Sequence, residues 1–140
     1  MSLGREKKMS IIFKDLQEPG NPLNGTQIDS AQEFRGILRR LAKRTPFLFE
    51  LRSDKGYRLT IGYAGQEGCA QYSASDGSPP YLMATSSQSL GEPDFVQFLA
   101  GDTPTPIPGR FCLPINVIEH VAKDFIEGAK RSEAVGWEEI

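Results

Sequence analysis

The sequence predicts an α+β fold, in which an antiparallel meander sheet of about five to six strands carries two main helices packed on one face. Two segments place apolar residues at three- and four-residue steps, which is the period of an amphipathic helix. Several shorter segments alternate apolar and polar residues, as strands with one buried face do. The 140 residues include 10 prolines and 14 glycines, most of them between apolar runs, and this favours short strands joined by turns over a helical bundle.

The length fits one domain, which we expect to span residues 9–140. Residues 1–8 are expected to be a cloning remnant or a disordered leader, since Met9 begins the first apolar run. No run of roughly 18 apolar residues and no secretory leader can be recognised. We therefore expect a cytoplasmic protein that does not enter a membrane, in which Cys69 and Cys112 are reduced, buried thiols.

The N-terminal half is expected to form a strand, a helix and a hairpin. Residues 10–13 are the strand candidate. Ser30 and Glu33 have capping-box spacing, in which the Ser30 hydroxyl accepts the Glu33 N–H and the Glu33 carboxylate reaches back to the Ser30 N–H. The first helix therefore begins there, and Pro46 prevents its continuation. Residues 47–52 and 57–63 alternate on either side of a turn and predict a hairpin with one buried face.

Three more strands are expected at residues 69–74, 80–86 and 94–100, because turn residues separate these segments and sequential neighbours tend to pair. A Pro-rich connection follows from Gly101 to Gly109. Leu113 and Pro114 begin the second helix, because proline fits the first helical position. Gly128 is suited to end that helix in the left-handed conformation.

The C-terminal tail, residues 135–140, contains the single tryptophan, Trp137. Its large amphipathic side chain either anchors the tail on the core or acts as an interface hot spot. Acidic pairs stand at Glu92 and Asp94 and at Glu138 and Glu139. These pairs are either solvated surface charge or part of a negative surface that complements a basic protein.

Catalytic and cofactor patterns are missing, so we expect no enzyme, no metal site and no cofactor. Tyr57, Asp76 and His120 are candidate acids or bases, but the sequence does not bring any two of them together. Nucleophile-elbow and phosphate-loop patterns do not occur. The net charge of −2 and the absence of a basic stripe make nucleic acid an unlikely direct partner.

One ordered set of segments carries a family resemblance. The set consists of the helix that begins at Ser30, the strand at 57–63, the turn Asp76-Gly77-Ser78-Pro79-Pro80-Tyr81-Leu82, and then Phe98, Gly101, Pro108, Leu113-Pro114, Phe125, Gly128 and Trp137. In this order and spacing, from Thr26 to Ile140, the chain resembles Imm family one, the immunity proteins of bacterial polymorphic toxin systems. It departs from the family pattern after Gly128, where Arg131 stands in place of a proline and the spacing to Trp137 is longer.

The resemblance implies an α+β fold and tight, non-enzymatic binding to a toxin, often one with a nucleic-acid deaminase domain. It supplies no catalytic residues and no contact motif. Because a toxin that acts on nucleic acid needs a basic groove, we expect acidic residues to contact it. The expected partner-binding residues are Asp76, Glu92, Asp94, Trp137, Glu138 and Glu139. The alternative is a secretion chaperone, with an exposed apolar patch that binds a disordered segment of an effector.

Overall fold

The computed structural model describes residues 10–41, 43–91 and 94–140, and the fold is given for these ranges. The expected leader, residues 1–8, lies outside them. In chain order the elements are β1 (Ile11–Asp15), α1 (Ala31–Leu41), β2 (Phe47–Ser53), β3 (Tyr57–Tyr63), β4 (Glu67–Ala74), β5 (Leu82–Thr85), β6 (Phe95–Ala100), β7 (Thr103–Pro108), the short helix η1 (Gly109–Phe111), β8 (Leu113–Pro114), α2 (Ile115–Gly128) and β9 (Gly136–Glu139). Among the described residues, no helix is long and apolar enough to cross a membrane.

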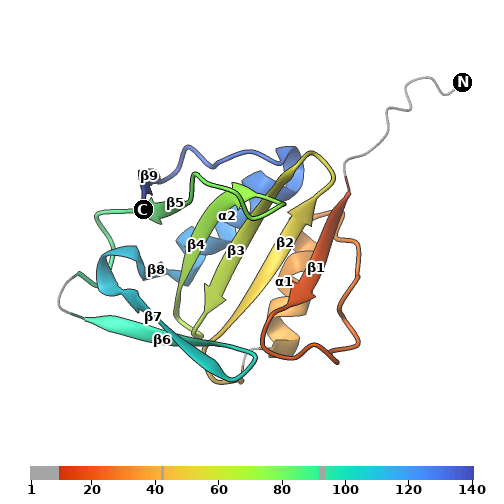
Figure 1. The fold of residues 1–140 in the computed structure, drawn as a ribbon, viewed down its shortest axis with the longest axis horizontal. Coiled ribbons are helices and arrows are strands. Elements are labelled where there is room, and N and C mark those ends of the chain that lie inside the picture. The colour runs from red at the N-terminus through yellow and green to blue at the C-terminus, as the bar shows by residue number, and fades with distance from the viewer. Residues whose placement is uncertain (1–9, 42, 92–93) are drawn as a thin grey trace, which may run out of the picture.

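The strands form one curled, mixed sheet in the order β7-β6-β2-β3-β4-β5-β9, with β1 beside β2 and β8 beside β4. The predicted antiparallel meander is present from β2 to β5. Both helices lie behind the sheet in Figure 1, and the β6–β7 hairpin crosses its lower end in front. The α+β class and the placement of both helices on one side of the sheet therefore agree with the sequence prediction.

The expected size and topology of the sheet were wrong. The described strands number nine rather than five or six, and the sheet is not purely antiparallel. Strand β6 returns to β2, where Leu99 pairs in parallel with Phe47 and its N–H donates to the Pro46 carbonyl at 2.9 Å. This edge is open because β1 pairs only with residues 49–53 of β2 and leaves the first residues of that strand to another partner.

The segment predicted as a Pro-rich connection is strand β7, paired with β6 over its full length. Its prolines, Pro104, Pro106 and Pro108, occupy alternate positions. Proline has no N–H to donate to β6, so these nitrogens lie on the outer edge of the strand. Such an edge is where a sheet tolerates proline.

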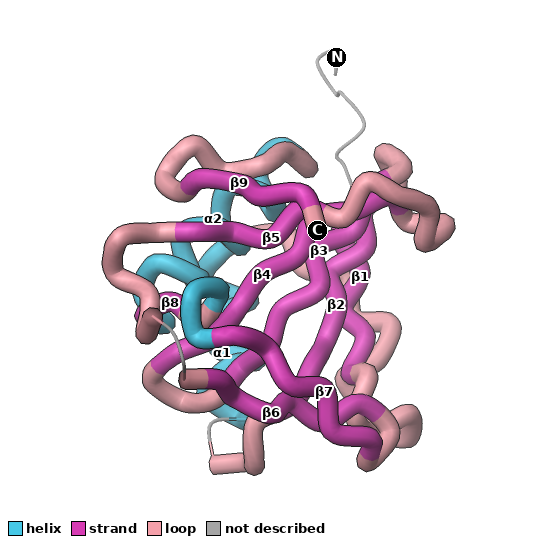
Figure 2. The backbone as a smooth tube through the Cα atoms, turned by 60° about the vertical axis from the view of Figure 1, so that its left-hand side comes forward, coloured by secondary structure: helices cyan, strands magenta, loops and turns pink. Residues whose placement is uncertain are grey.

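Two apolar clusters hold the layers together. The larger one lies between the sheet and the helices and includes Phe34, Phe49, Ile61 and Phe125. The smaller one lies on the opposite face, under the β6–β7 hairpin, and consists of Cys69, Met83, Phe98, Phe111 and Cys112. Both cysteines are free and buried, as the sequence predicted. Figure 2 shows the resulting shape, with β5 and β9 side by side at one end and the β6–β7 hairpin at the other.

The helix ends follow the sequence prediction in part. The Ser30 hydroxyl accepts the Glu33 N–H at 3.1 Å, but the Glu33 carboxylate accepts from the Asp29 N–H rather than from Ser30. Helix α2 begins at Ile115, so Leu113 and Pro114, which were expected to be its first residues, instead form strand β8 and pair with Gly68 and Glu67 of β4. Gly128 is its last residue, and the left-handed conformation falls on Ala129, whose φ is 53° and whose N–H donates to the Phe125 carbonyl at 2.7 Å. The helix therefore ends one residue later than predicted, because Gly128 was expected in the left-handed position that Ala129 takes.

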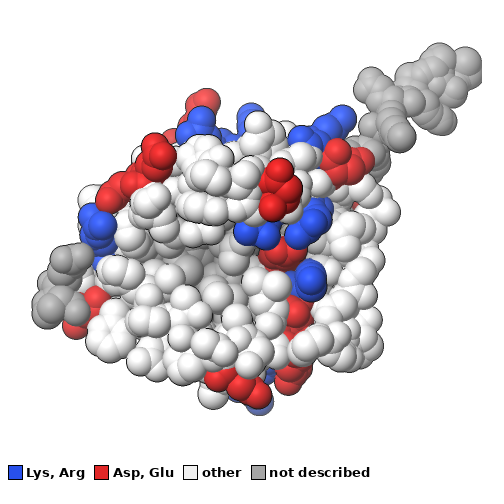
Figure 3. Space-filling view, in the orientation of Figure 1, with Lys and Arg blue, Asp and Glu red and all other residues white. Residues whose placement is uncertain are grey.

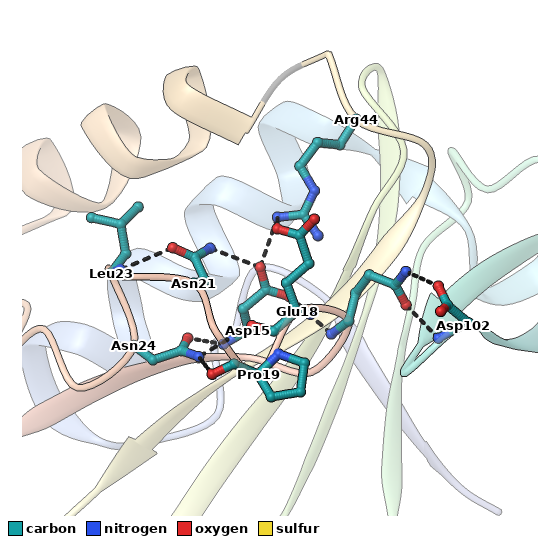
Figure 4. A network of polar contacts seen from close by, with 9 residues as sticks. Asp15, Glu18, Pro19, Asn21, Leu23, Asn24, Arg44 and Asp102 are labelled. Carbon is teal, nitrogen blue, oxygen red and sulfur yellow. Dashed lines mark hydrogen bonds and ion pairs between the residues drawn. The ribbon is translucent and has the colours of Figure 1, made fainter.

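A buried carboxylate, Asp15, fixes the loop that connects β1 to α1 (Figure 4). It accepts hydrogen bonds from the backbone N–H groups of Gln17 and Glu18 and from the Asn21 amide, at 2.8 to 3.0 Å. The Arg44 guanidinium completes the set with an ion pair of 2.7 Å. Gln17 also bonds Asp102 at the tip of the β6–β7 hairpin, so the same loop holds that hairpin in place.

Candidate partner-binding surface

Strand alternation divides the side chains of β1 to β4 between two faces. One row enters the core against the helices, and the other row forms a face turned away from them, which we call the outer face. It carries Lys14, Glu50, Arg52, Arg58, Thr60, Gln71 and Ser73, by the register of the four strands. Figure 3 shows that acidic and basic groups alternate over β1 to β3 on this side, whereas the surface over the middle of the β6–β7 hairpin is uncharged.

The outer face contains a buried carboxylate, Glu50, whose side chain is only 4% exposed. Arg52 approaches one of its oxygens with Nη2 at 3.0 Å and Nε at 3.2 Å. Arg58 lies 3.7 Å from the other oxygen and donates through Nε to the buried Ser73 hydroxyl at 3.2 Å. Two guanidiniums thus cover one carboxylate, and the sheet backbone fixes all four residues.

A second feature is an aromatic groove at the end of β3 and β4, with a volume of about 460 Å³. The rings of Tyr57 and Tyr72 stack in it with centroids 5.1 Å apart. Pro79 and Pro80 line it from the following turn, and the Arg131 guanidinium lies 5.9 Å from the Tyr72 ring. Burial raises the pKa of Tyr72, with a further contribution from Tyr57 that Arg131 opposes.

Trp137 also contacts Tyr72, with ring centroids 6.1 Å apart. Its indole N–H donates to the Ser132 carbonyl at 2.9 Å, and the half-buried ring packs against the main core. The structure therefore gives Trp137 the role of a tail anchor, while a contact with a partner stays a prediction. The proline turn and Trp137, two parts of the family resemblance, meet here around Tyr72.

Asp76, another expected contact residue, lies on the turn between β4 and β5. Its carboxylate accepts from the Ser78 hydroxyl at 2.6 Å and from the Ser78 N–H at 2.9 Å. These hydrogen bonds, with the Arg58 charge as a smaller contribution, lower the pKa of Asp76. Asp76 therefore borders the basic side chains of the outer face.

The remaining acidic residues lie near the β9 edge of the sheet. Glu138 and Glu139 are on β9, and Glu138 forms an ion pair with Arg110 at 3.0 Å. The carbonyl of Asp94 accepts the N–H of Gly109, the residue before Arg110, which brings Asp94 close to the same site. Glu92 lies outside the described residues. The expected contact residues therefore do not form one acidic patch, because Asp76 stands apart from Asp94, Glu138 and Glu139.

The residues considered as acids or bases do not come together. Tyr57 stacks on Tyr72, Asp76 bonds within its own turn, and His120 is exposed on α2, 3.5 Å from Asp124. Within the described residues, no group of three His, Cys, Asp or Glu side chains is arranged to hold a metal ion.

Sequence reasoning missed the cluster of Glu50, Arg52 and Arg58. The alternation of residues 47–52 with 57–63 contains the signal, because all three side chains take the polar positions of the predicted hairpin. Burial of Glu50 was not predictable from that pattern, since polar positions of a hairpin normally face water. The aromatic groove was missed because Tyr72, the turn prolines and Arg131 come from three separate segments.

Comparison with known proteins gives one family match. The family model described as immunity protein Imm1 matches residues 24–139, nearly the whole of the described chain. A comparison with curated proteins finds no match.

Proposed function

The chain belongs to the Imm1 family of immunity proteins, and from this premise we propose that it is an antitoxin that binds a cognate toxin domain and blocks it. The family match across residues 24–139 is the observation that carries the proposal. The mechanism is exclusion: a tightly bound, folded protein covers the toxin's active-site cleft and keeps substrate out. The chain itself transforms nothing, and it acts in the cytoplasm, where the toxin would otherwise reach its target.

We further propose that the toxin belongs to a polymorphic toxin system and acts on nucleic acid, as a deaminase domain does. Its substrate groove would then be basic, and acidic groups of this chain would face it. Asp94, Glu138 and Glu139 near one sheet edge are the strongest candidates, together with Asp76 and Glu92, and with Trp137 as the apolar member. This edge supports the proposal because β9 is the last strand of the sheet and its acidic side chains are accessible.

The experiment that tests the proposal uses the toxin domain encoded beside the gene for this chain. Cells that express the toxin domain alone are expected to stop growing, and co-expression of this chain is expected to restore growth. The two purified proteins should form a complex that abolishes toxin activity in vitro. Growth arrest that persists despite abundant folded chain, with no complex on gel filtration, would reject the immunity role.

A specific observation also favours the alternative, a secretion chaperone. The side of the β6–β7 hairpin turned away from Phe98 is mostly apolar, with Gln97 as its polar residue on β6, and Phe95 on it is 57% exposed. Pro104, Pro106 and Pro108 on the same hairpin are also exposed. Patches of this kind mark interaction sites, and they fit either a folded toxin or an extended effector segment. Binding to the folded toxin domain but not to a disordered fragment of the same protein decides for immunity.

A further inference from the structure

The accessible charge of the outer face at its β1 to β3 end is positive. Three of its charged residues at the β1 to β3 end are basic, namely Lys14, Arg52 and Arg58, and the acidic one is the buried Glu50. Arg52 is 47% exposed and Lys14 is exposed, whereas Arg58 is largely held by Glu50 and Ser73. Among the residues that the structure describes, Lys14 forms no ion pair, and Nη1 of Arg52 has no partner.

The register brings these two accessible cations together. Lys14 on β1 pairs with Glu50 on β2, and Ile12 pairs with Arg52, so Lys14 and Arg52 are diagonal neighbours on one face. Diagonal neighbours across an antiparallel pair lie within reach of long side chains. A carboxylate that approaches this face from outside therefore meets two cations at once.

The buried Glu50 explains why Arg52 is well prepared for such a contact. Stability alone does not require a carboxylate here, because an apolar side chain of similar volume avoids the cost of desolvating two charges. What Glu50 provides is orientation: two nitrogens of Arg52 contact it, while the side chain stays 47% exposed. A side chain ordered before binding loses less conformational entropy when the partner arrives.

The charges around this site favour a protein partner over nucleic acid. The chain as a whole carries a net charge of −2, so a long polyanion is repelled outside the immediate contact. Nucleic-acid sites neutralise a run of phosphates with many cations, whereas two accessible cations match one or two carboxylates.

We propose that the outer face at β1 to β3 is a docking surface for an acidic segment of the toxin domain, with Lys14 and Arg52 as the contacting cations and Glu50 as the positioning residue. This proposal rests on the proposed function, since it takes the toxin as the partner. The acidic side chains on β9 lie at the other edge of the same sheet. A partner with acidic and basic regions is therefore held in one orientation, because the reversed orientation places like charges together.

The test compares variants of this surface with matched variants on the helix layer. Lys14→Glu and Arg52→Gln change the outer face, whereas Arg39→Glu and Arg39→Gln make the same kinds of change at an exposed residue of α1. Association with the toxin domain is measured by surface plasmon resonance at low and high salt. Lys14→Glu is expected to slow association by roughly tenfold or more at low salt, with a smaller effect at high salt. The Arg39 variants are expected to bind like the wild type.

Glu50→Gln tests the positioning role. The substitution keeps the side-chain volume and makes the face more positive, so association at low salt is expected to become faster. Arg52 loses its charged partner, so dissociation is expected to become faster as well. If Glu50 has only a structural role, the substitution lowers the folded fraction, which circular dichroism reports. The association and dissociation rate constants of the folded protein then stay unchanged.

The outcomes separate this proposal from the proposed function. A wild-type chain that does not bind the toxin domain rejects the proposed function. A wild-type chain that binds, with Lys14→Glu and Arg52→Gln binding equally well, rejects the docking surface and leaves the immunity role intact. If the wild type binds a single-stranded oligonucleotide and both outer-face variants lose that binding, the assignment of a protein partner is wrong.

Discussion

Asp15 shows how one side chain holds a segment that has no regular structure. Burial by itself raises the pKa of this carboxyl, but the hydrogen bonds from Arg44, Asn21, Glu18 and Gln17 outweigh burial, and the pKa lies below its ordinary value of 3.8. A carboxyl whose pKa is lower in the folded state stabilises the fold at every pH above its unfolded pKa. That stabilisation is lost as the pH falls through the lowered folded pKa.

We predict that Asp15→Asn lowers the free energy of unfolding by about 1.5–3 kcal/mol at pH 7, because the partly buried Arg44 loses its 2.7 Å ion pair and keeps only the exposed Glu18 at 3.6 Å. The difference from the wild type should begin to shrink below about pH 4, where the carboxyl of the unfolded wild type takes up a proton, and it should disappear only below the lowered pKa of the folded state. Urea unfolding at pH 7 and at pH 3 measures both values. Asp29→Asn, at an exposed residue, is the control, and an equal loss for Asp15→Asn at both pH values would contradict the ion-pair argument.

The two cysteines give a second prediction at this scale. Burial raises the pKa of Cys69 to about 12 and that of Cys112 to about 11. The thiolate is the reactive form, and at pH 8 roughly one thiol in a thousand or fewer carries it. We expect neither cysteine to react with Ellman's reagent in the native protein, and both to react in urea. Rapid modification of either thiol in the folded protein would mean that the cluster beneath the β6–β7 hairpin opens.

At the scale of elements, Gly62 allows the β6–β7 hairpin to pack on the outer face of the sheet. A Cβ at this position would lie 2.7 Å from the Cys69 sulfur and 2.8 Å from the Phe98 ring, both of which are buried. We predict that Gly62→Ala destabilises the protein by about 1–3 kcal/mol through overpacking. Gly36→Ala is the matched control, because a Cβ there meets nothing within 4 Å and alanine favours the helix by about 0.5–1 kcal/mol. Thermal unfolding of both variants should give shifts of opposite sign.

The elements also show what local sequence determines. Both helices, the 47–63 hairpin and the meander as far as β5 were predictable, because capping residues, apolar periods and turns are local signals. The pairing of β6 with β2 was not predictable, since nothing in the local sequence around Phe47 or Leu99 indicates that these two residues pair. Strand β7 was missed because its prolines normally end strands, and only the edge position makes them acceptable. In the candidate site, the register that buries Glu50 between Arg52 and Arg58 follows from pairing and not from composition.

At the scale of the whole molecule, the open edges of the sheet determine how the protein meets other chains. An exposed strand edge can pair with a second molecule, and proteins avoid this with short, charged or proline-containing edge strands. Strand β9 at one end is short and carries Glu138 and Glu139. Strand β7 at the other end is six residues long and has no charged side chain, so its prolines are its protection. Recognition of a partner is then left to side chains and not to strand pairing.

We therefore predict that replacing Pro104 and Pro106 by threonine makes the protein self-associate. Threonine restores two N–H donors on the outer edge of β7 and favours the strand conformation, while the pairing with β6 is retained. Pro19→Thr, in the loop after β1, is the control, because it changes no strand edge. Light scattering across a concentration series should show larger particles for the double variant alone, with far-UV circular dichroism confirming that it folds. If the folded double variant scatters like the wild type at every concentration, the prolines do not protect this edge and β7 is blocked by its side chains instead.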